Sequence, residues 1–381
     1  MTTSSASSCG SPKSSKNWLT LSGPKTSWPF TKCGIVAASL HAAFQNEAFL
    51  SKGCVRVGAA TKVQAKYVLI SPCRNEAAYI RKTLDSVVAQ TVLPALWIIV
   101  DDGSTDDTPA ILAEYADRHT WIKVVPRTDR GHRAVGPGVI DAFYSGLATI
   151  DLDDYEFICK LDVDLDLPTT YFETLIIRMQ RNARLGSCSG KPYFRTEGGQ
   201  WVSEKCGDEM SVGMTKFYRV TCFKAIGGFV REVMWDGIDC HKSRQLGWIV
   251  RSWDDPELRF EHLRPMGSSQ QNILTGRKRH GYGQYYMGSD PLYFMATALY
   301  RMTQRPFVVG GAAMLYGYFN AMVRRLPQHG DAELRRFIRS YQRQALRVGK
   351  AQAIRNIEAK QESRWHKFRG QMTEAGTVGG L

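Results

Sequence analysis

The chain has 381 residues, 43% of them hydrophobic and 23% charged, which suits one large folded domain or two ordinary ones and excludes a disordered chain. Its formal net charge of +14 lies at the two ends, because residues 1–65 and 324–381 carry an excess of Lys and Arg while residues 66–323 hold equal numbers of bases and acids. A nucleic-acid-binding protein carries its basic patch on the folded domain, so this distribution argues against a nucleic-acid partner.

The N-terminal segment and the cysteines predict a cytoplasmic protein. Residues 1–65 form a basic extension, rich in Ser and Lys near its start, that we expect to be flexible, and they lack the early apolar run of a secretory signal. The nine cysteines are scattered without a CxxC pair, which argues against a zinc site. Their odd number suits a reducing compartment better than a disulfide framework.

From residue 66 onwards, short apolar runs alternate with segments of helical spacing. The apolar runs predict buried strands at residues 67–71, 96–100, 121–125 and 157–161. A helix is expected over residues 75–88, and a second one begins at Thr108, where Pro109 follows a capping residue. This order predicts an α/β fold with a mostly parallel sheet, in which ligands bind at the carboxyl ends of the strands.

Carboxylates follow three of these strands. Glu76 comes after the first strand, the pair Asp101-Asp102 ends the second, and Asp162 and Asp164 follow the fourth. In an extended segment Asp162 and Asp164 project on the same side, where they could share a hard cation. Their spacing is also typical of a solvated loop, and the Asp101-Asp102 pair is typical of a turn with a helix cap, so both interpretations stay open on spacing alone.

In this order and spacing, several segments resemble the family 2 glycosyltransferases of the GT-A fold. The likeness covers roughly residues 66–260, and the segments that carry it are Ser71-Pro72-Cys73-Arg74-Asn75-Glu76, Ile99-Val100-Asp101-Asp102-Gly103-Ser104-Thr105-Asp106, Leu161-Asp162-Val163-Asp164, Gly227-Gly228-Phe229, and Trp235-Asp236-Gly237-Ile238-Asp239 leading to Gly247-Trp248. Residues 281–319 look similar to bacterial members associated with exopolysaccharide synthesis. The resemblance implies a GT-A domain over residues 66–290, with a mostly parallel mixed sheet flanked by helices, and a helical extension over residues 291–381.

The resemblance also implies roles for individual residues. A nucleotide-sugar donor would bind residues at the strand ends, namely Pro72, Arg74, Asn75, Glu76, Asp101, Asp102, Arg130 and Asp162. Asp162 and Asp164 match the DxD motif of the family, which holds Mn²⁺ or Mg²⁺ against the donor diphosphate. Asp236 matches the catalytic base of these inverting enzymes. The family usually has Glu-Asp where this chain has Trp235-Asp236, so Asp239 stays an alternative for the base.

Two further features leave two interpretations each. His262 follows Glu261 on an expected strand and is either a third metal ligand or a packing residue. The basic run at residues 277–280 is either a solvated loop or a flexible loop that faces the donor diphosphate.

The C-terminal third predicts a contact with an anionic membrane. Residues 307–323 carry no charge but fall short of the roughly 20 residues that span a bilayer, so they indicate a buried core helix or an interfacial helix pair. From Leu334 to Ala345 apolar residues recur at helical spacing with arginines between them, which favours a basic amphipathic helix on an anionic membrane. The acceptor would then be lipid-linked, and the protein peripheral on the cytoplasmic face.

Together these features predict an inverting, metal-dependent glycosyltransferase of the hexosyltransferase type. It would move a sugar from a UDP- or GDP-linked donor to a hydroxyl of a lipid-linked or polysaccharide acceptor in cell-surface or exopolysaccharide synthesis. The first alternative is a sugar-phosphate nucleotidylyltransferase, but its expected Gly-rich, Lys-bearing signature does not follow Ser71. The second is a non-catalytic membrane adaptor, which would not need carboxylates at successive strand ends.

Overall fold

The computed structural model describes residues 63–129, 131, 136–264, 273–304, 306–367 and 370. The extension predicted for residues 1–65 lies outside this part of the chain, apart from its last three residues, and the donor contact predicted for Arg130 lies outside it as well. All the elements below belong to one compact unit.

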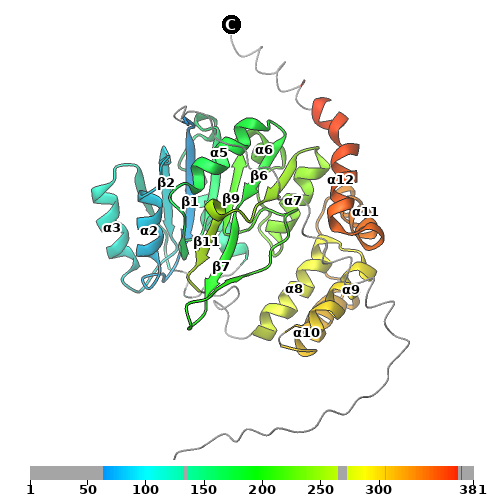
Figure 1. Ribbon diagram of the computed structural model, residues 1–381. Helices are drawn as coiled ribbons and strands as arrows, with labels where there is room; N and C mark the ends of the chain where they lie inside the picture. Colours follow the sequence, from blue (N-terminus) through cyan, green and yellow to red (C-terminus); the bar gives the residue numbers. More distant parts are fainter. Residues whose placement is uncertain are drawn as a thin grey trace, which may run out of the picture. The chain divides into compact units, whose positions relative to one another are not determined.

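The main sheet has seven strands in the order β10-β6-β9-β4-β1-β2-β3 (Figure 1). These strands are β1 (Tyr67–Cys73), β2 (Leu96–Asp101), β3 (Ile122–Pro126), β4 (Phe157–Leu161), β6 (Leu185–Ser189), β9 (Thr215–Arg219) and β10 (Ile249–Ser252). Only β9 runs antiparallel to its neighbours, β4 and β6. The four strands predicted from the apolar runs are all present.

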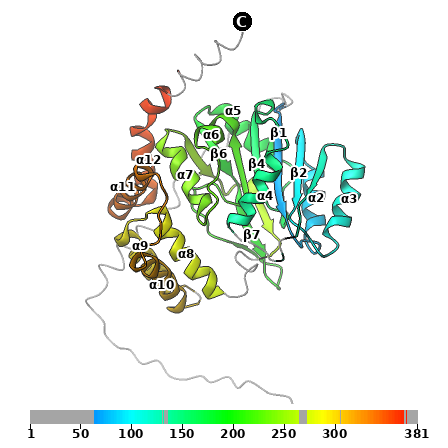
Figure 2. The same ribbon diagram turned by 180° about the vertical axis from the view of Figure 1, so that it is seen from behind.

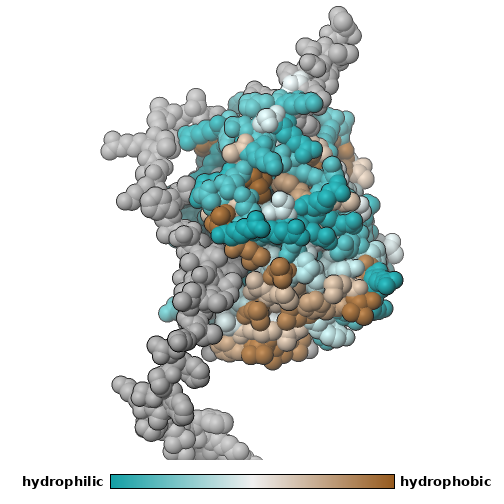
Figure 3. Space-filling view, turned by 90° about the vertical axis from the view of Figure 1, so that its right-hand side faces the viewer, coloured by the Kyte–Doolittle hydropathy of each residue, from teal (hydrophilic) through white to brown (hydrophobic). Residues whose placement is uncertain are grey.

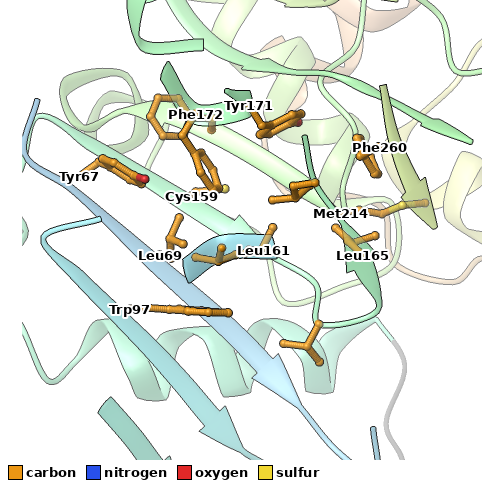
Figure 4. Packing of buried hydrophobic residues seen from close by; sticks show 14 of the residues in the cluster. Tyr67, Leu69, Trp97, Cys159, Leu161, Leu165, Tyr171, Phe172, Met214 and Phe260 are labelled. Carbon is orange, nitrogen blue, oxygen red and sulfur yellow. The ribbon is translucent and has the colours of Figure 1, made fainter. Parts of the chain in front are cut away.

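Helices cover both faces of this sheet. Side chains alternate along a strand, so Tyr67 and Leu69 of β1 enter one core while Val68 and Ile70 enter the other. The first face is covered by α2 (Ile80–Val88), α3 (Thr108–Arg118) and α5 (Tyr171–Arg181), and the second by α4 (Pro137–Leu147) and α6 (Val220–Ala225). Figure 4 shows the first core, in which the rings of Tyr67 and Phe172 lie 5.2 Å apart, and Figure 2 shows α4 on the opposite side.

A smaller sheet positions His262 near the end of β4. Its strands, in the order β5-β11-β7-β8, are β5 (Leu165–Asp166), β11 (Arg259–His262), β7 (Lys191–Arg195) and β8 (Trp201–Ser203). Because β11 pairs antiparallel with β5, His262 lies opposite Leu165, the residue after Asp164. Helix α7 (Trp235–Gln245) adds Trp235 to the second core.

The C-terminal region is helical, as predicted. It consists of α8 (Ile273–Met287), α9 (Pro291–Met302), α10 (Val309–Val323), α11 (Ala332–Val348) and α12 (Lys350–Lys360). Across the ranges that the structure describes, no helix combines the length and the hydropathy needed to cross a membrane. The predicted fold class, a mostly parallel mixed sheet flanked by helices with a helical C-terminal extension, is confirmed.

Helix α11 has the predicted amphipathic pattern, but its apolar face is buried within the protein. Leu334 and Ile338 pack with Ile238 of α7 and Met287 of α8, and the ring of Tyr341 lies 5.3 Å from His241 of α7. Helix α12 is fixed too, because Arg251 of β10 forms an ion pair with Glu358. The apolar face of α11 is therefore not available to a bilayer, and the sequence pattern could not show this because a protein core and a bilayer require the same spacing.

Candidate active site

The loops after β1 and β2 hold each other in place at the carboxyl edge of the sheet. Asn75, with a φ of 51°, donates its backbone N–H to Ser104 Oγ at 2.9 Å, and its side-chain Oδ1 accepts from the backbone N–H of Thr105 at 2.7 Å. Asp101 Oδ1 accepts from the backbone N–H of Ser104 at 3.0 Å. In this structure, Asn75 and Asp101 therefore shape the two loops.

Charged side chains extend this edge to the loop after β3. Arg127 Nη1 lies 2.9 Å from Asp102 Oδ1, and Arg74 forms an ion pair with Asp129. Gly103 allows the loops to approach, because a Cβ there would lie 2.5 Å from Asp129 Cα. Arg127 and Asp129 were missed from the sequence, although they follow a strand end as the predicted residues do. Pro72 lies within β1, opposite Val100.

Arg264 joins the loop after β1 to the predicted DxD motif. Its guanidinium donates to Glu76 Oε1 at 2.7 Å and to Asp164 Oδ2 at 2.7 Å. Glu76 is nearly inaccessible, and its backbone N–H donates to Thr108 Oγ1 at 2.9 Å. The sequence analysis did not identify Arg264 as a site residue. Its position two residues after the end of β11 was the feature that could have indicated it.

Asp162 and Asp164 lie at the end of β4 in different surroundings. Asp162 is half-buried, and Lys160 Nζ donates to its Oδ1. Asp164 is buried, with His262 Nε2 at 3.4 Å from its Oδ2. Burial acts to raise the pKa of both carboxyl groups; it prevails at Asp162, whereas His262 and Arg264 hold the pKa of Asp164 below its usual value.

The residues around Asp164 supply some, but not all, of the ligands that a divalent cation needs. Two carboxylates and one imidazole are donors that Mn²⁺ accepts, and His262 is oriented by Glu204, whose Oε2 lies 3.0 Å from His262 Nδ1. Among the residues that the structure describes, however, no three His, Cys, Asp or Glu side chains are gathered closely enough to hold a metal ion. Mg²⁺ sites commonly combine one or two carboxylates with substrate phosphates, and the carboxylates of this edge suit such a site.

Asp236 and Asp239 lie near the start of α7, less than one turn apart. Asp239 is buried and paired, since Lys216 Nζ lies 2.6 Å from both of its oxygens and Tyr218 donates to Oδ2. Although burial acts to lower the pKa of Lys216, the carboxylate of Asp239 raises it above its usual value. Asp236 is half-buried, and its carboxylate forms no comparable ion pair with any residue that the structure describes.

A chain of contacts through Lys160 and Gly213 connects Asp236 to the DxD motif. Lys160 Nζ donates both to Asp162 and to the carbonyl oxygen of Gly213, the latter at 3.0 Å. A Cβ on Gly213 would lie 3.2 Å from Asp236 Oδ2, so the absence of a side chain leaves room beside this carboxylate. The aromatic ring of Trp235 lies 5.2 Å from Lys160 Nζ. Asp236 of α7 is thus connected to Asp162, which follows β4, through Gly213 and Lys160.

His280 of α8 is buried within electrostatic range of Asp236 and of Arg301 in α9. Burial, together with the charge of Arg301, lowers the pKa of His280 to about 4, while the carboxylate of Asp236 acts in the opposite direction. Residues 277–280 are part of α8 and not of a loop, which corrects both interpretations of the basic run.

One known protein family matches the segment of the chain that contains the motifs at this edge. The model of the family described as Glycosyl transferase family 2 matches residues 68–234. This segment is a family 2 glycosyltransferase domain. It spans β1 to the residue before α7, and so contains every predicted donor-binding and DxD residue but not Asp236.

Curated relatives share only part of their length with this chain. The domain is similar to the poly-beta-1,6-N-acetyl-D-glucosamine synthase of Staphylococcus epidermidis, with 29% identity over 33% of this chain and 28% of the relative. It is also similar to the uncharacterized glycosyltransferase YibD of Escherichia coli, with 25% identity over 36% of this chain and 38% of the relative. The chain thus matches well under half the length of these relatives.

Solved structures with a similar course of the chain include a mannosyltransferase and a TarS protein. The mannosyltransferase PcManGT from Pyrobaculum calidifontis, in complex with GDP-Man and Mn²⁺, has a TM-score of 0.46 and 16% identity, over 87% of this chain and 93% of that one. Residues 1–349 of TarS from S. aureus, in complex with UDP-GlcNAc, have a TM-score of 0.48 and 16% identity, over 80% of this chain and 92% of that one.

Proposed function

We propose that this protein is an inverting glycosyltransferase that moves a sugar from a nucleotide-diphosphate donor to a hydroxyl of a glycan acceptor. The observation that carries the proposal is the position of Asp236, a half-buried carboxylate that approaches the DxD segment through Lys160 and Gly213. The family 2 domain supplies the donor-binding edge of the sheet. The poly-beta-1,6-N-acetyl-D-glucosamine synthases among its relatives support a UDP-GlcNAc-like donor and a polysaccharide acceptor.

The donor binds across the carboxyl ends of β1, β2 and β4 in this proposal. Its base and ribose contact the loops that Asn75 and Asp101 shape, and its diphosphate lies toward Asp162 and Asp164. Arg74 and Arg127 add positive charge at the same edge. Asp162 and Asp164, with His262 beside them, would hold a divalent cation, which would supply positive charge that stabilises the departing diphosphate.

The transfer itself requires one base and no protein nucleophile. Asp236 accepts the proton of the acceptor hydroxyl while the hydroxyl oxygen attacks the anomeric carbon on the face opposite the diphosphate. The bond between sugar and phosphate oxygen breaks, and its electron pair leaves with the nucleoside diphosphate. The ion pair of Asp239 with Lys216 and its hydrogen bond from Tyr218, both inside the core, support Asp236 rather than Asp239 for this role.

The proposed cellular location of the enzyme depends on its acceptor. We propose that the acceptor is lipid-linked or a growing cell-surface polysaccharide, and that the protein binds peripherally to the cytoplasmic face of an anionic membrane. The relatives that synthesise a polysaccharide support the glycan part of this proposal. The basic C-terminal third of the chain supports the membrane part.

The experiment is a thermal-shift panel of UDP- and GDP-sugars with and without Mn²⁺. At least one donor should raise the Tm of the wild type in a metal-dependent way, by the linkage of binding to stability. Asp164→Asn should lose this shift. The matched control is Asp166→Asn in the same segment, since Asp166 pairs with Lys82 at 3.2 Å and has no place in the site. Equal shifts for both variants would remove the metal assignment, and no shift with any donor would contradict the proposal.

A further inference from the structure

Large apolar side chains are exposed on α9 and α10. Leu292 and Leu299 of α9 are 64% and 56% exposed, and Tyr316 and Val323 of α10 are 59% and 78% exposed. We call these four residues, together with Phe307, Val308 and Val309, the α9–α10 apolar surface. Figure 3 shows hydrophobic residues gathered on the part of the molecule where Figure 1 places α8–α10, with mainly hydrophilic residues beside them.

Helix α10 has one buried face and one exposed face. The buried face combines glycines and alanines with Met314 and Tyr318, and a Cβ on Gly317 would lie 2.0 Å from the carbonyl oxygen of Lys278 in α8. Gly281 of α8 approaches Met314 of α10 in the same way, because a Cβ there would lie 2.0 Å from its carbonyl oxygen. Val309, Tyr316 and Val323 recur every seven residues and share the opposite face of the helix. Helix α10 thus exposes apolar residues on the face where a surface helix usually carries polar ones.

The charges around this surface are of one sign. Residues 273–325 contain seven Lys and Arg and a single acid, Asp290, which is buried and paired with Arg343 at 2.7 Å. Lys278 Nζ lies 5.2 Å from the ring of Tyr316, and Arg324 is exposed at the end of α10. An apolar face bordered by cations, with no exposed acid among the described residues of α8–α10, is complementary to an anionic bilayer surface.

We infer that the α9–α10 apolar surface is where the protein docks on an anionic membrane. Its apolar side chains enter the boundary between head groups and acyl chains, and Lys278 and Arg324 contact the anionic head groups. The amphipathic helix α11 does not serve this purpose, because Leu334 and Ile338 are buried in the protein. The inference deepens the proposed function only by assigning the surface that brings the enzyme to a membrane-bound acceptor.

Helix α8 packs between this surface and the proposed active site. Helix α8, which packs on α10, also packs on the residues that precede Asp236, since a Cβ on Gly283 would lie 2.4 Å from Met234 Cγ. A bilayer against α9 and α10 would therefore lie next to the helix that supports the start of α7. This arrangement suits an acceptor whose reactive sugar is held near the membrane surface.

The test is cosedimentation of the full chain with vesicles of phosphatidylcholine containing about 30% phosphatidylglycerol. The double variant Leu299→Glu/Tyr316→Glu should bind at least about tenfold more weakly than the wild type, because two apolar side chains become anionic. A second variant, Arg324→Glu/Arg325→Glu, should weaken binding and its dependence on phosphatidylglycerol. The matched control is Leu93→Glu, at an apolar residue 44% exposed between α2 and β2, which should bind as the wild type does.

The inference would be overturned if the wild type did not bind these vesicles, or if the double variant bound them as tightly as the wild type. It would also be overturned if the wild type formed a dimer in solution and did not bind vesicles, while the double variant was a monomer. The last result would show that the surface joins two copies of the chain. Cleavage of a nucleotide-sugar, measured without vesicles in the same preparations, separates this inference from the proposed function. Vesicle binding that depends on α9 and α10, without cleavage of any donor, would reject the enzyme and leave the docking surface standing.

Discussion

Two aspartates less than one turn apart on α7 have opposite environments. Asp239 neutralises the buried Lys216, while Asp236 faces the DxD segment across Gly213. Removing one partner of a buried ion pair leaves an uncompensated charge in the core. Asp239→Asn should therefore lower the free energy of unfolding by about 3–5 kcal/mol, measured by urea denaturation. A loss below about 1 kcal/mol would show that Lys216 does not depend on this carboxylate.

Asp236→Asn should have the reverse profile. Transfer should fall by about 10²–10⁴, the usual loss when a positioned base is removed. Donor affinity and stability should stay near the wild-type values, because no ion pair within the described residues depends on this carboxylate. The measurement is the transfer rate beside the donor Kd. Near-normal transfer by Asp236→Asn, with slow transfer by a folded Asp239→Asn, would move the base to Asp239.

His241 makes stability depend on pH. Burial, and then the charge of Arg244, lower the pKa of His241 to about 3, so its imidazole is neutral in the folded protein. The unfolded chain, with a histidine pKa of about 6.5, binds this proton more readily, so stability is full above that pH and is lost as the pH falls toward the folded pKa.

His241→Phe keeps a ring against Tyr341 and removes the proton. Between pH 7 and pH 5 the wild type should lose about 2 kcal/mol more stability than this variant. Urea denaturation at the two pH values measures the difference. Parallel losses in the two proteins would mean that His241 is solvated or already paired in the folded state.

At the scale of elements, α8 and α10 depend on glycines at their contact. A Cβ on Gly317 would meet the backbone of Lys278, which cannot turn aside as a flexible side chain can. Gly317→Ala should therefore destabilise the protein by about 1–3 kcal/mol, although alanine is the better helix former. Gly330→Ala is the control, because a Cβ there meets nothing within 4 Å. Thermal unfolding of the two variants tests the contact, and equal Tm values would contradict it.

The strands and the carboxylates at their ends could be predicted because their signals are local. A buried parallel strand is a short apolar run, and the polar residues that follow it must lie at one edge of the sheet. Asp101 accordingly ends β2, and Asp162 comes directly after β4. Arg264 could not be placed, since its contacts with Glu76 and Asp164 depend on the second sheet. The choice between Asp236 and Asp239 also needed the structure, because it depends on Lys216 in β9.

The amphipathic pattern of α11 shows the same limit at the scale of an element. The spacing of Leu334, Ile338 and Tyr341 requires an apolar partner, and α7 and α8 supply it. Conversely, the uncharged run at residues 307–323 proved to have two faces, one of glycines against α8 and one of exposed apolar residues. Which apolar face is covered depends on tertiary packing, and the sequence pattern alone does not contain that information.

At the scale of the whole molecule, one chain combines the sheet edge proposed to bind the donor, the aspartate proposed as the base on α7, and a helical region that packs against α7. Arg184 and Arg251 bind α12 to the domain, and Trp365 packs on Trp248 in the second core. The C-terminal helices are therefore part of the folded unit. A chain truncated before α11 would expose the apolar residues of α7 and α8 and is unsuitable for testing membrane binding.

The most direct test of the account is release of nucleoside diphosphate by the full chain, measured on UDP-GlcNAc and a panel of other UDP- and GDP-sugars with a glycan acceptor. The account predicts release from at least one donor, loss of that release in EDTA, recovery with Mn²⁺ or Mg²⁺, and a fall of at least about 10² in Asp164→Asn. Absence of release from every donor with metal present, or release that continues undiminished in EDTA, would contradict it.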